Sequence, residues 1–213
     1  MARRVKAGKA SSRGASQGEA SAEDRLVDAA LAVAARQGWR SAGLGEIAHE
    51  AGLTPAEAYA ACRSKPAILL AWHRRIDRAA LAGAGAAGEE PARDRLFDLL
   101  MRRFDVLQPH RAALRVILRD SFGDPAALCG VPALLGSMAW MLEGAGVSTA
   151  GLRGRLRSKI LMGLYFSVLR VFLQDDSADL TRTMAALDRR LRRAESWLGL
   201  GRPIRGEGAA AST

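Results

Sequence analysis

Apolar residues recur every three to four positions through most of the chain, which is the spacing of amphipathic α-helices. The first such stretch begins after Ser21, a typical helix N-cap, and ends at Gly38, a residue suited to the position after a helix. No stretch alternates apolar and polar residues as a half-buried strand would. The pattern therefore predicts an all-α protein of about eight or nine helices.

The most informative pattern lies in residues 44–65. A short apolar stripe ends at Gly52, a residue that adopts left-handed backbone angles easily. Thr54 and Glu57 then have the spacing of a capping box, with Pro55 at the first helical position. The capping box accounts for Glu57, and a contact between Glu57 and DNA bases is the alternative. Two short helices joined by a glycine-containing turn are the pattern of a helix-turn-helix.

After this region the glycine-rich segment 83–88 predicts a hinge, and five more helices are expected beyond it. Those helices lie near residues 91–107, 110–119, 125–142, 152–173 and 179–198. Residues 1–20 hold almost no large apolar side chains and therefore predict a disordered basic arm. The predicted organisation is this arm, a helix-turn-helix domain at 21–82, a helical body at 83–198 and a flexible tail at 199–213.

The charge of the chain is concentrated at its ends. The net charge is +10, of which residues 1–20 carry +4 and residues 151–213 carry +6. A basic arm can follow DNA phosphates or enter a minor groove, and a solubilising tail is the alternative. Residues 189–193 hold four arginines on the last predicted helix. This run predicts a solvated helix face, with contact to an anionic membrane as the alternative.

Several function classes are disfavoured by what the sequence lacks. Two cysteines, Cys62 and Cys129, do not make a disulfide framework, and no metal-binding spacing is present. No apolar run is long enough for a membrane span, and the N-terminus lacks the apolar core of a secretory signal. The three histidines are scattered, and no nucleophile or phosphate-binding motif occurs. We therefore expect a cytoplasmic protein that is not an enzyme and needs no cofactor.

Two apolar groups remain to be placed. Residues 160–172 are apolar on nearly every face of a helix, so every face must be covered. A dimer interface accounts for this, and a central core helix of a monomer is the alternative. Methionine and aromatic side chains also make adaptable ligand cavities. The candidates for such a cavity are Phe104, Met138, Trp140, Met141 and Tyr165, each with plain core packing as its alternative.

Four features of residues 24–81 occur together at a characteristic spacing. They are the stretch DRLVDAALAVAARQGWR, the turn LGEIAHEAGLT, Tyr59 near the end of the second short helix, and Ser64-Lys65 at the start of the next. In these features the segment resembles the DNA-binding domain of the TetR family of bacterial transcription regulators. The chain departs from the family pattern at Ala58, where a large apolar residue is usual, and at Ala61-Cys62, where His-Phe is usual. A third departure is that the second short helix carries Glu57 and no Lys or Arg of its own.

The resemblance implies a three-helix head on double-stranded DNA and a helical body that binds a small apolar ligand. Thr54, Tyr59 and Lys65 would contact phosphates, and Pro55 and Ala56 would approach bases. The last two helices would form a homodimer, so that two heads read a palindromic operator. The candidate interface residues are Leu161, Leu164, Val168, Phe172, Leu187 and Leu191. A ligand would change the spacing or angle of the heads, and the expected outcome is repression.

A second resemblance concerns roughly residues 138–193. The most specific piece is Leu173-Gln174-Asp175-Asp176-Ser177, followed by a helix that carries the sequence LDRR from position 187. This half of the chain is similar to the ubiquinone-biosynthesis lipid-binding proteins, which share the TetR-like fold. It implies an alternative function, an isoprenoid-lipid carrier in quinone biosynthesis with little DNA affinity. A protein-interaction module that uses the basic last helix is a third, weaker alternative.

Overall fold

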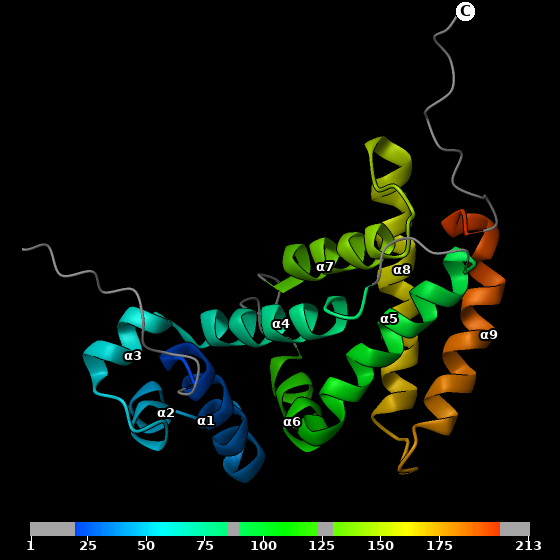
Figure 1. Ribbon diagram of the computed structural model, residues 1–213. Helices are drawn as coiled ribbons and strands as arrows, with labels where there is room; N and C mark the ends of the chain where they lie inside the picture. Colours follow the sequence, from blue (N-terminus) through cyan, green and yellow to red (C-terminus); the bar gives the residue numbers. More distant parts are fainter. Residues whose placement is uncertain (1–19, 85–89, 123–129, 201–213) are drawn as a thin grey trace, which may run out of the picture.

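The computed structural model describes residues 20–84, 90–122 and 130–200, and these residues form helices and no strands (Figure 1). The helices are α1 (Ala22–Gln37), α2 (Leu44–Glu50), α3 (Pro55–Ala61), α4 (Lys65–Leu81), α5 (Ala92–Leu107), the 3-10 turn η1 (Gln108–His110), α6 (Arg111–Ser121), α7 (Gly130–Gly144), α8 (Gly151–Phe172) and α9 (Thr181–Leu198). The predicted all-α fold is confirmed.

The first three helices pack into a small head around buried aliphatic side chains. Leu26, Ile47 and Ile68 are almost fully buried there and fill the space between α1, α2 and the start of α4. The guanidinium of Arg25 donates to the carbonyl oxygens of Ala51 (2.6 Å) and Gly52 (2.9 Å) and so fixes the turn between α2 and α3. Gly52 has a φ of +63°, a backbone angle that favours glycine.

Helix α4 connects the head to the body of the protein. It begins at the Ser64 N-cap directly after α3, and Figure 1 shows it running from the head to the larger group of helices. It packs on α1 at one end and on α5 and α7 along the rest of its length. A shift of α4 relative to the body therefore also moves the head.

The body is built around the long pair α8 and α9, which lie side by side at the far end from the head (Figure 1). Helix α7 covers α8, and α5 lies between α4 and α9. The ring of Phe104 on α5 stacks on the ring of Tyr165, with 5.3 Å between the ring centroids, and lies 5.1 Å from the centroid of the Phe172 ring. Tyr165 and Phe172 are both on α8. These three buried rings fill the centre of the body.

Some predicted segments lie outside the described residues. Residues 1–19, 85–89 and 201–213 include nearly all of the predicted arm and tail and most of the predicted hinge. The helix expected near 125–142 begins at Gly130 within the described part of the chain and ends at Gly144. The other four body helices begin and end within two residues of their predicted positions.

The segment 173–177, which carries the second resemblance, closes the turn between α8 and α9. The carboxylate of Asp175 is fully buried and accepts hydrogen bonds from the backbone N–H (2.8 Å) and the hydroxyl (2.7 Å) of Thr183. It also accepts from the backbone N–H (3.2 Å) and the hydroxyl of Ser177. Burial acts to raise the pKa of Asp175, but these four bonds outweigh it and lower the pKa to about 2. Asp175 therefore caps the first turn of α9.

This cap can be tested by Asp175→Asn, which keeps the size of the side chain and removes its charge and one acceptor. We expect the free energy of unfolding to fall by about 1–3 kcal/mol at pH 7, because buried donors of Ser177 or Thr183 lose their partner. Asp176→Asn, at the exposed neighbouring position, should change it by less than about 0.5 kcal/mol. Urea unfolding followed by circular dichroism measures both, and equal effects would contradict the cap.

Candidate functional site

Helix α3 presents an exposed face beside the turn of the helix-turn-helix. Thr54, Pro55, Ala56 and Tyr59 are all exposed, and Tyr59 is 62% exposed. Ala58 is buried on the opposite face of α3, against the head. The four residues predicted to contact DNA from this helix and its cap thus share one accessible surface.

The capping box predicted at the start of α3 is confirmed. The Glu57 carboxylate accepts from the backbone N–H (2.8 Å) and the hydroxyl (2.7 Å) of Thr54, and the Thr54 oxygen accepts from the backbone N–H of Glu57 (3.3 Å). The hydrogen bonds from Thr54 lower the pKa of Glu57. The Glu57 carboxylate is thereby held at the N-terminus of α3. The Thr54 hydroxyl donates its proton to this carboxylate.

Lys65 does not share the exposed face of α3. Its ammonium donates to the carbonyl oxygens of Trp39 and Arg40 and lies over the Trp39 ring, 4.6 Å from the ring centroid. In this structure Lys65 therefore holds the loop between α1 and α2, and its ammonium does not lie on the face of α3 that is predicted to contact phosphates. The signal Ser64-Lys65 marked the start of α4 correctly.

The sequence reasoning missed Arg63. This residue is exposed two positions after the end of α3, and its guanidinium lies 5.8 Å from the centroid of the Tyr59 ring. It forms no ion pair with another described residue. The available signal was its position, because a basic residue immediately after the second short helix lies at the edge of the face that α3 exposes.

A cavity of about 540 Å³ lies between the head and the body. Its walls come from α4, α5, α6, α7 and α8, and Trp39 and Arg40 of the head close one side. Most of the lining residues are aliphatic or aromatic, including Leu69, Leu114 and Leu134. A volume of this size suits a small organic molecule.

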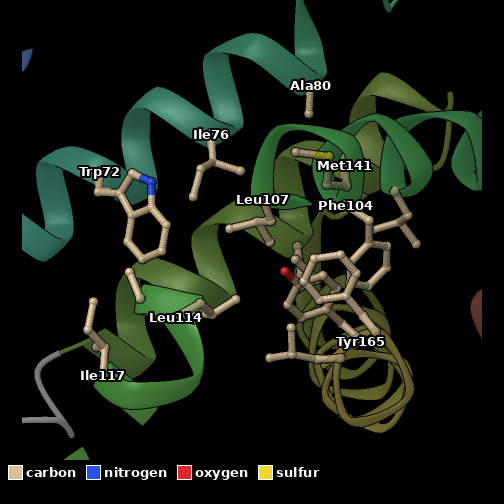
Figure 2. Packing of buried hydrophobic residues seen from close by; sticks show 14 of the residues in the cluster. Trp72, Ile76, Ala80, Phe104, Leu107, Leu114, Ile117, Met141 and Tyr165 are labelled. Atoms are coloured by element: carbon tan, nitrogen blue, oxygen red, sulfur yellow. The ribbon is translucent and has the colours of Figure 1, made fainter. Parts of the chain in front are cut away.

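Of the five residues predicted to line a cavity, Tyr165 does so. Phe104 and Met141 are fully buried in the adjoining core instead (Figure 2), and Met138 is fully buried as well. Trp140 is 66% exposed, on the outer face of α7. These four residues do not line this cavity, because residue type indicates adaptable apolar packing, whereas the position of a void depends on how the helices cross.

A polar cluster lies at one end of the cavity around Arg103, which is only 2% exposed. Its guanidinium forms an ion pair with Asp77 and donates to Ser137 (2.9 Å), Tyr165 (3.2 Å) and Nδ1 of His73 (3.2 Å). The Ser137 hydroxyl donates to Asp77 at 2.7 Å. The sequence carries a signal for this cluster, since Arg103 falls at helical spacing between the buried residues Leu99, Leu100 and Leu107.

His73 is neutral in this environment. Burial lowers its pKa to about 4, and the positive charge of Arg103 acts in the same direction. Because a guanidinium can only donate, Nδ1 of His73 is the acceptor and the ring proton resides on Nε2.

The head also contacts the body through Asp120 at the end of α6. Its carboxylate accepts from the backbone N–H groups of Trp39 (2.8 Å) and Arg40 (3.3 Å), and Arg40 Nε donates to the Asp120 carbonyl oxygen (2.8 Å). Trp39, Arg40 and Asp120 all line the cavity. A molecule in the cavity would therefore touch both sides of this contact.

The predicted dimer-interface residues require a correction. All six lie in the interior of the single chain: Leu161, Leu164, Val168, Phe172, Leu187 and Leu191. The exposed apolar residues of α8 are instead Leu152, Leu156 and Phe166, on the opposite face of the helix. Since α8 is apolar on several faces, its sequence did not show which face packs on the body.

Within the described residues, no cluster of His, Cys, Asp and Glu could hold a metal ion. No helix among them combines the length and the apolar character that crossing a membrane requires.

The neutral state of His73 has a consequence for stability. Since its pKa is about 4 in the folded chain and 6.5 when exposed, the unfolded chain binds more protons between these values. The free energy of unfolding should therefore fall by about 3 kcal/mol as the pH drops from 6.5 to 4. His73→Gln keeps an acceptor for Arg103 but does not titrate, so it should remove this loss. His49→Gln, at an exposed position, should retain it. Urea unfolding at pH 4.5, 5.5 and 7.5 compares them, and parallel curves for all three proteins would contradict this assignment.

No protein-family model and no curated protein matches the chain in sequence. Solved structures match over most of its length. A TetR transcriptional regulator from Nitrosomonas europaea aligns with a TM-score of 0.69 and 25% identity, over 83% of this chain and 98% of that chain. A TetR transcriptional regulator from Rhodococcus sp. RHA1 aligns with a TM-score of 0.58 and 18% identity, over 80% and 96%. A TetR-family regulator from Streptomyces coelicolor aligns with a TM-score of 0.54 and 17% identity, over 90% and 94%.

These likenesses cover the head and the body together rather than one of them. The helix order, the capped second helix of the helix-turn-helix and the nearly complete coverage of the solved structures agree with the resemblance in the sequence. The chain has the fold of the TetR-family transcriptional regulators.

Proposed function

We propose that this protein is a TetR-type DNA-binding transcription regulator, a repressor rather than an enzyme, that works as a cytoplasmic homodimer controlled by a small apolar ligand. The observation that carries the proposal is the exposed, well-capped face of α3 behind a glycine turn, in the fold of known regulators. The largely apolar cavity between head and body supports control by a ligand.

On DNA, α3 would enter the major groove as the recognition helix. Its first residues, Pro55 and Ala56, are small and exposed and would let the helix approach the base edges. Tyr59 would donate its hydroxyl to a phosphate, and Arg63 beside it would add a charged phosphate contact. Thr54 would contact a phosphate by turning its hydroxyl proton from Glu57 to a phosphate oxygen, while Lys65 would act indirectly by holding the loop that supports α2.

The proposed role of each segment follows the domains expected from the sequence. Residues 21–82 would form the DNA-binding head and residues 83–198 the ligand-binding and dimerisation body. The basic residues of 1–20 would follow the DNA backbone next to the head.

The ligand would act through α4 and α6. A ligand shifts an equilibrium only by its differential affinity for two arrangements of the protein. The cavity is lined both by α4 and by the Asp120 contact to the loop of residues 39 and 40, so its shape changes whenever the head moves relative to the body. Occupancy of the cavity would therefore favour one head position over another.

The proposed dimer would use the outer face of α8 together with α9. Leu152, Leu156 and Phe166 lie within one stripe along α8, and Gly163 on the same stripe allows close approach of a second helix. This stripe leaves apolar area in water in the isolated chain, and a second copy would cover it.

DNA binding can be tested by fluorescence anisotropy with the chain's own upstream DNA, at about 150 mM salt and with unrelated competitor. We expect saturable binding with a Kd on the order of 10⁻⁸ M. Arg63→Ala should weaken it about tenfold and reduce its salt dependence, because one phosphate contact is lost. Arg182→Ala removes the same charge from an exposed position on α9 and should not change the Kd. Binding no tighter than to unrelated DNA, with isoprenoid lipid found in the purified protein, would contradict this proposal and favour the lipid carrier.

The dimer can be tested by sedimentation velocity at about 10 µM protein, where we expect a dimer. Leu156→Glu should give a monomer, because it would bury a carboxylate in the interface. Leu44→Glu places the same change at an exposed leucine of the head, at the start of α2, and should remain dimeric. A monomeric unmodified protein, or a dimeric Leu156→Glu variant, would contradict the proposed interface.

A further inference from the structure

The polar end of the cavity has more hydrogen-bond donors than acceptors. Arg103 on α5, His73 on α4 and Tyr165 on α8 all line the cavity there. In Figure 2 the oxygen of Tyr165 points away from the aromatic stack, toward the side where Leu107 and Leu114 lie. Whether these three side chains have unused donors or unused acceptors decides which ligand chemistry fits.

The guanidinium of Arg103 has five N–H donors. Nε donates to Tyr165, Nη1 donates to Asp77 and Ser137, and Nη2 donates to His73. One hydrogen of Nη2 therefore has no acceptor among the described residues. Since Arg103 is 2% exposed, water does not easily satisfy this donor.

Tyr165 provides a second unused donor. The ring proton of His73 lies on Nε2, which is buried 3.5 Å from an oxygen of Asp77, and a backbone hydrogen bond with Ala133 acts to raise the pKa of His73. This proton therefore stays within the chain. The Tyr165 oxygen accepts from Arg103, and its own proton goes to no described residue. An occupant of this end is thus required to accept hydrogen bonds rather than donate them.

Charge excludes a cationic group from the same place. Asp77 already balances Arg103, and Asp120, the carboxylate among the described lining residues, accepts from the backbone N–H groups of Trp39 and Arg40 where the head contacts the body. The Tyr165 ring face is also occupied, because the Arg103 guanidinium lies 5.2 Å from its centroid. A buried ammonium group would face the guanidinium without a counter-ion of its own.

The remainder of the cavity is apolar and suits a hydrocarbon chain or ring. Its walls include Leu69, Ile76, Leu107, Leu114, Leu134 and Leu169. Burial of an apolar body against these side chains would supply most of the affinity, and the donors would fix its orientation.

We propose that this cavity binds an elongated apolar molecule that ends in a hydrogen-bond acceptor, a carbonyl or a carboxylate, with the acceptor against Arg103 and Tyr165. The proposal rests on the proposed function only in taking this cavity as the ligand site. It goes further by naming the chemistry of the ligand and the two residues that select it.

Three probes of equal chain length test the chemistry: decanoate, decan-2-one and decyltrimethylammonium. Isothermal titration calorimetry of the full chain, below the aggregation concentration of each probe, should give one binding event per chain for the two acceptors. We expect both to bind at least tenfold more tightly than the cation. If decanoate binds and decan-2-one does not, the result would support the proposal with a carboxylate as the acceptor.

Variants test the place of the head group. Tyr165→Phe keeps the stacked ring and removes the hydroxyl, so it should weaken decanoate binding about 3- to 30-fold. Tyr59→Phe removes the same atom from the other tyrosine of the chain, on the head and outside the cavity, and should leave the decanoate Kd unchanged. Leu134→Trp should abolish binding by filling the cavity, with thermal unfolding as the check that it folds.

The proposal is overturned if the cation binds as tightly as the acceptors, if no probe binds, or if Tyr165→Phe and Tyr59→Phe have equal effects. The DNA measurement separates this result from the proposed function. Selective acceptor binding by a protein that does not bind DNA would sustain the ligand assignment and contradict the regulator. Specific DNA binding by a protein that binds none of the probes would sustain the regulator and contradict the ligand assignment.

Discussion

Burial of the Arg103 guanidinium is the constraint on which the arrangement of the body depends. A buried charge is costly unless it is paired and its hydrogen-bonding groups are satisfied. The partners of Arg103 come from three other helices: Asp77 and His73 from α4, Ser137 from α7 and Tyr165 from α8. Each helix must therefore hold its position relative to α5, or a buried charge loses a partner. The hydrogen bonds and the ion pair of Arg103 depend on direction more strongly than apolar contacts do.

The same cluster connects the cavity to the DNA-binding head. Helix α4 carries Asp77 and His73 near its end in the body and begins directly after α3 in the head. The cavity is lined by this helix, by the cluster and by the Asp120 contact to the loop between α1 and α2. A molecule bound there would contact the charged cluster and the edge of the head at once. The fold thus places a candidate ligand site where small movements of α4 matter most.

Local signals accounted for the helices and for the recognition surface. The caps at Ser21, Thr54 and Ser64 were readable because a cap depends on residues at most three positions apart. The exposed side of α3 followed from the same stretch of sequence. Lys65 was readable as a helix start, but its contact with Trp39 was not, because the partner is distant in sequence.

The sequence by itself determined the all-α class, the helix-turn-helix and the positions of most helices, since these depend on the period and the capping of short segments. Only the tertiary structure decided which face of α8 is covered, where the void lies and what neutralises Arg103. Hydrophobic periodicity shows that a helix face is apolar, but it does not show what lies against that face. The inner face of α8 and the cavity residues were therefore settled by how the helices cross, which is a property of the whole chain.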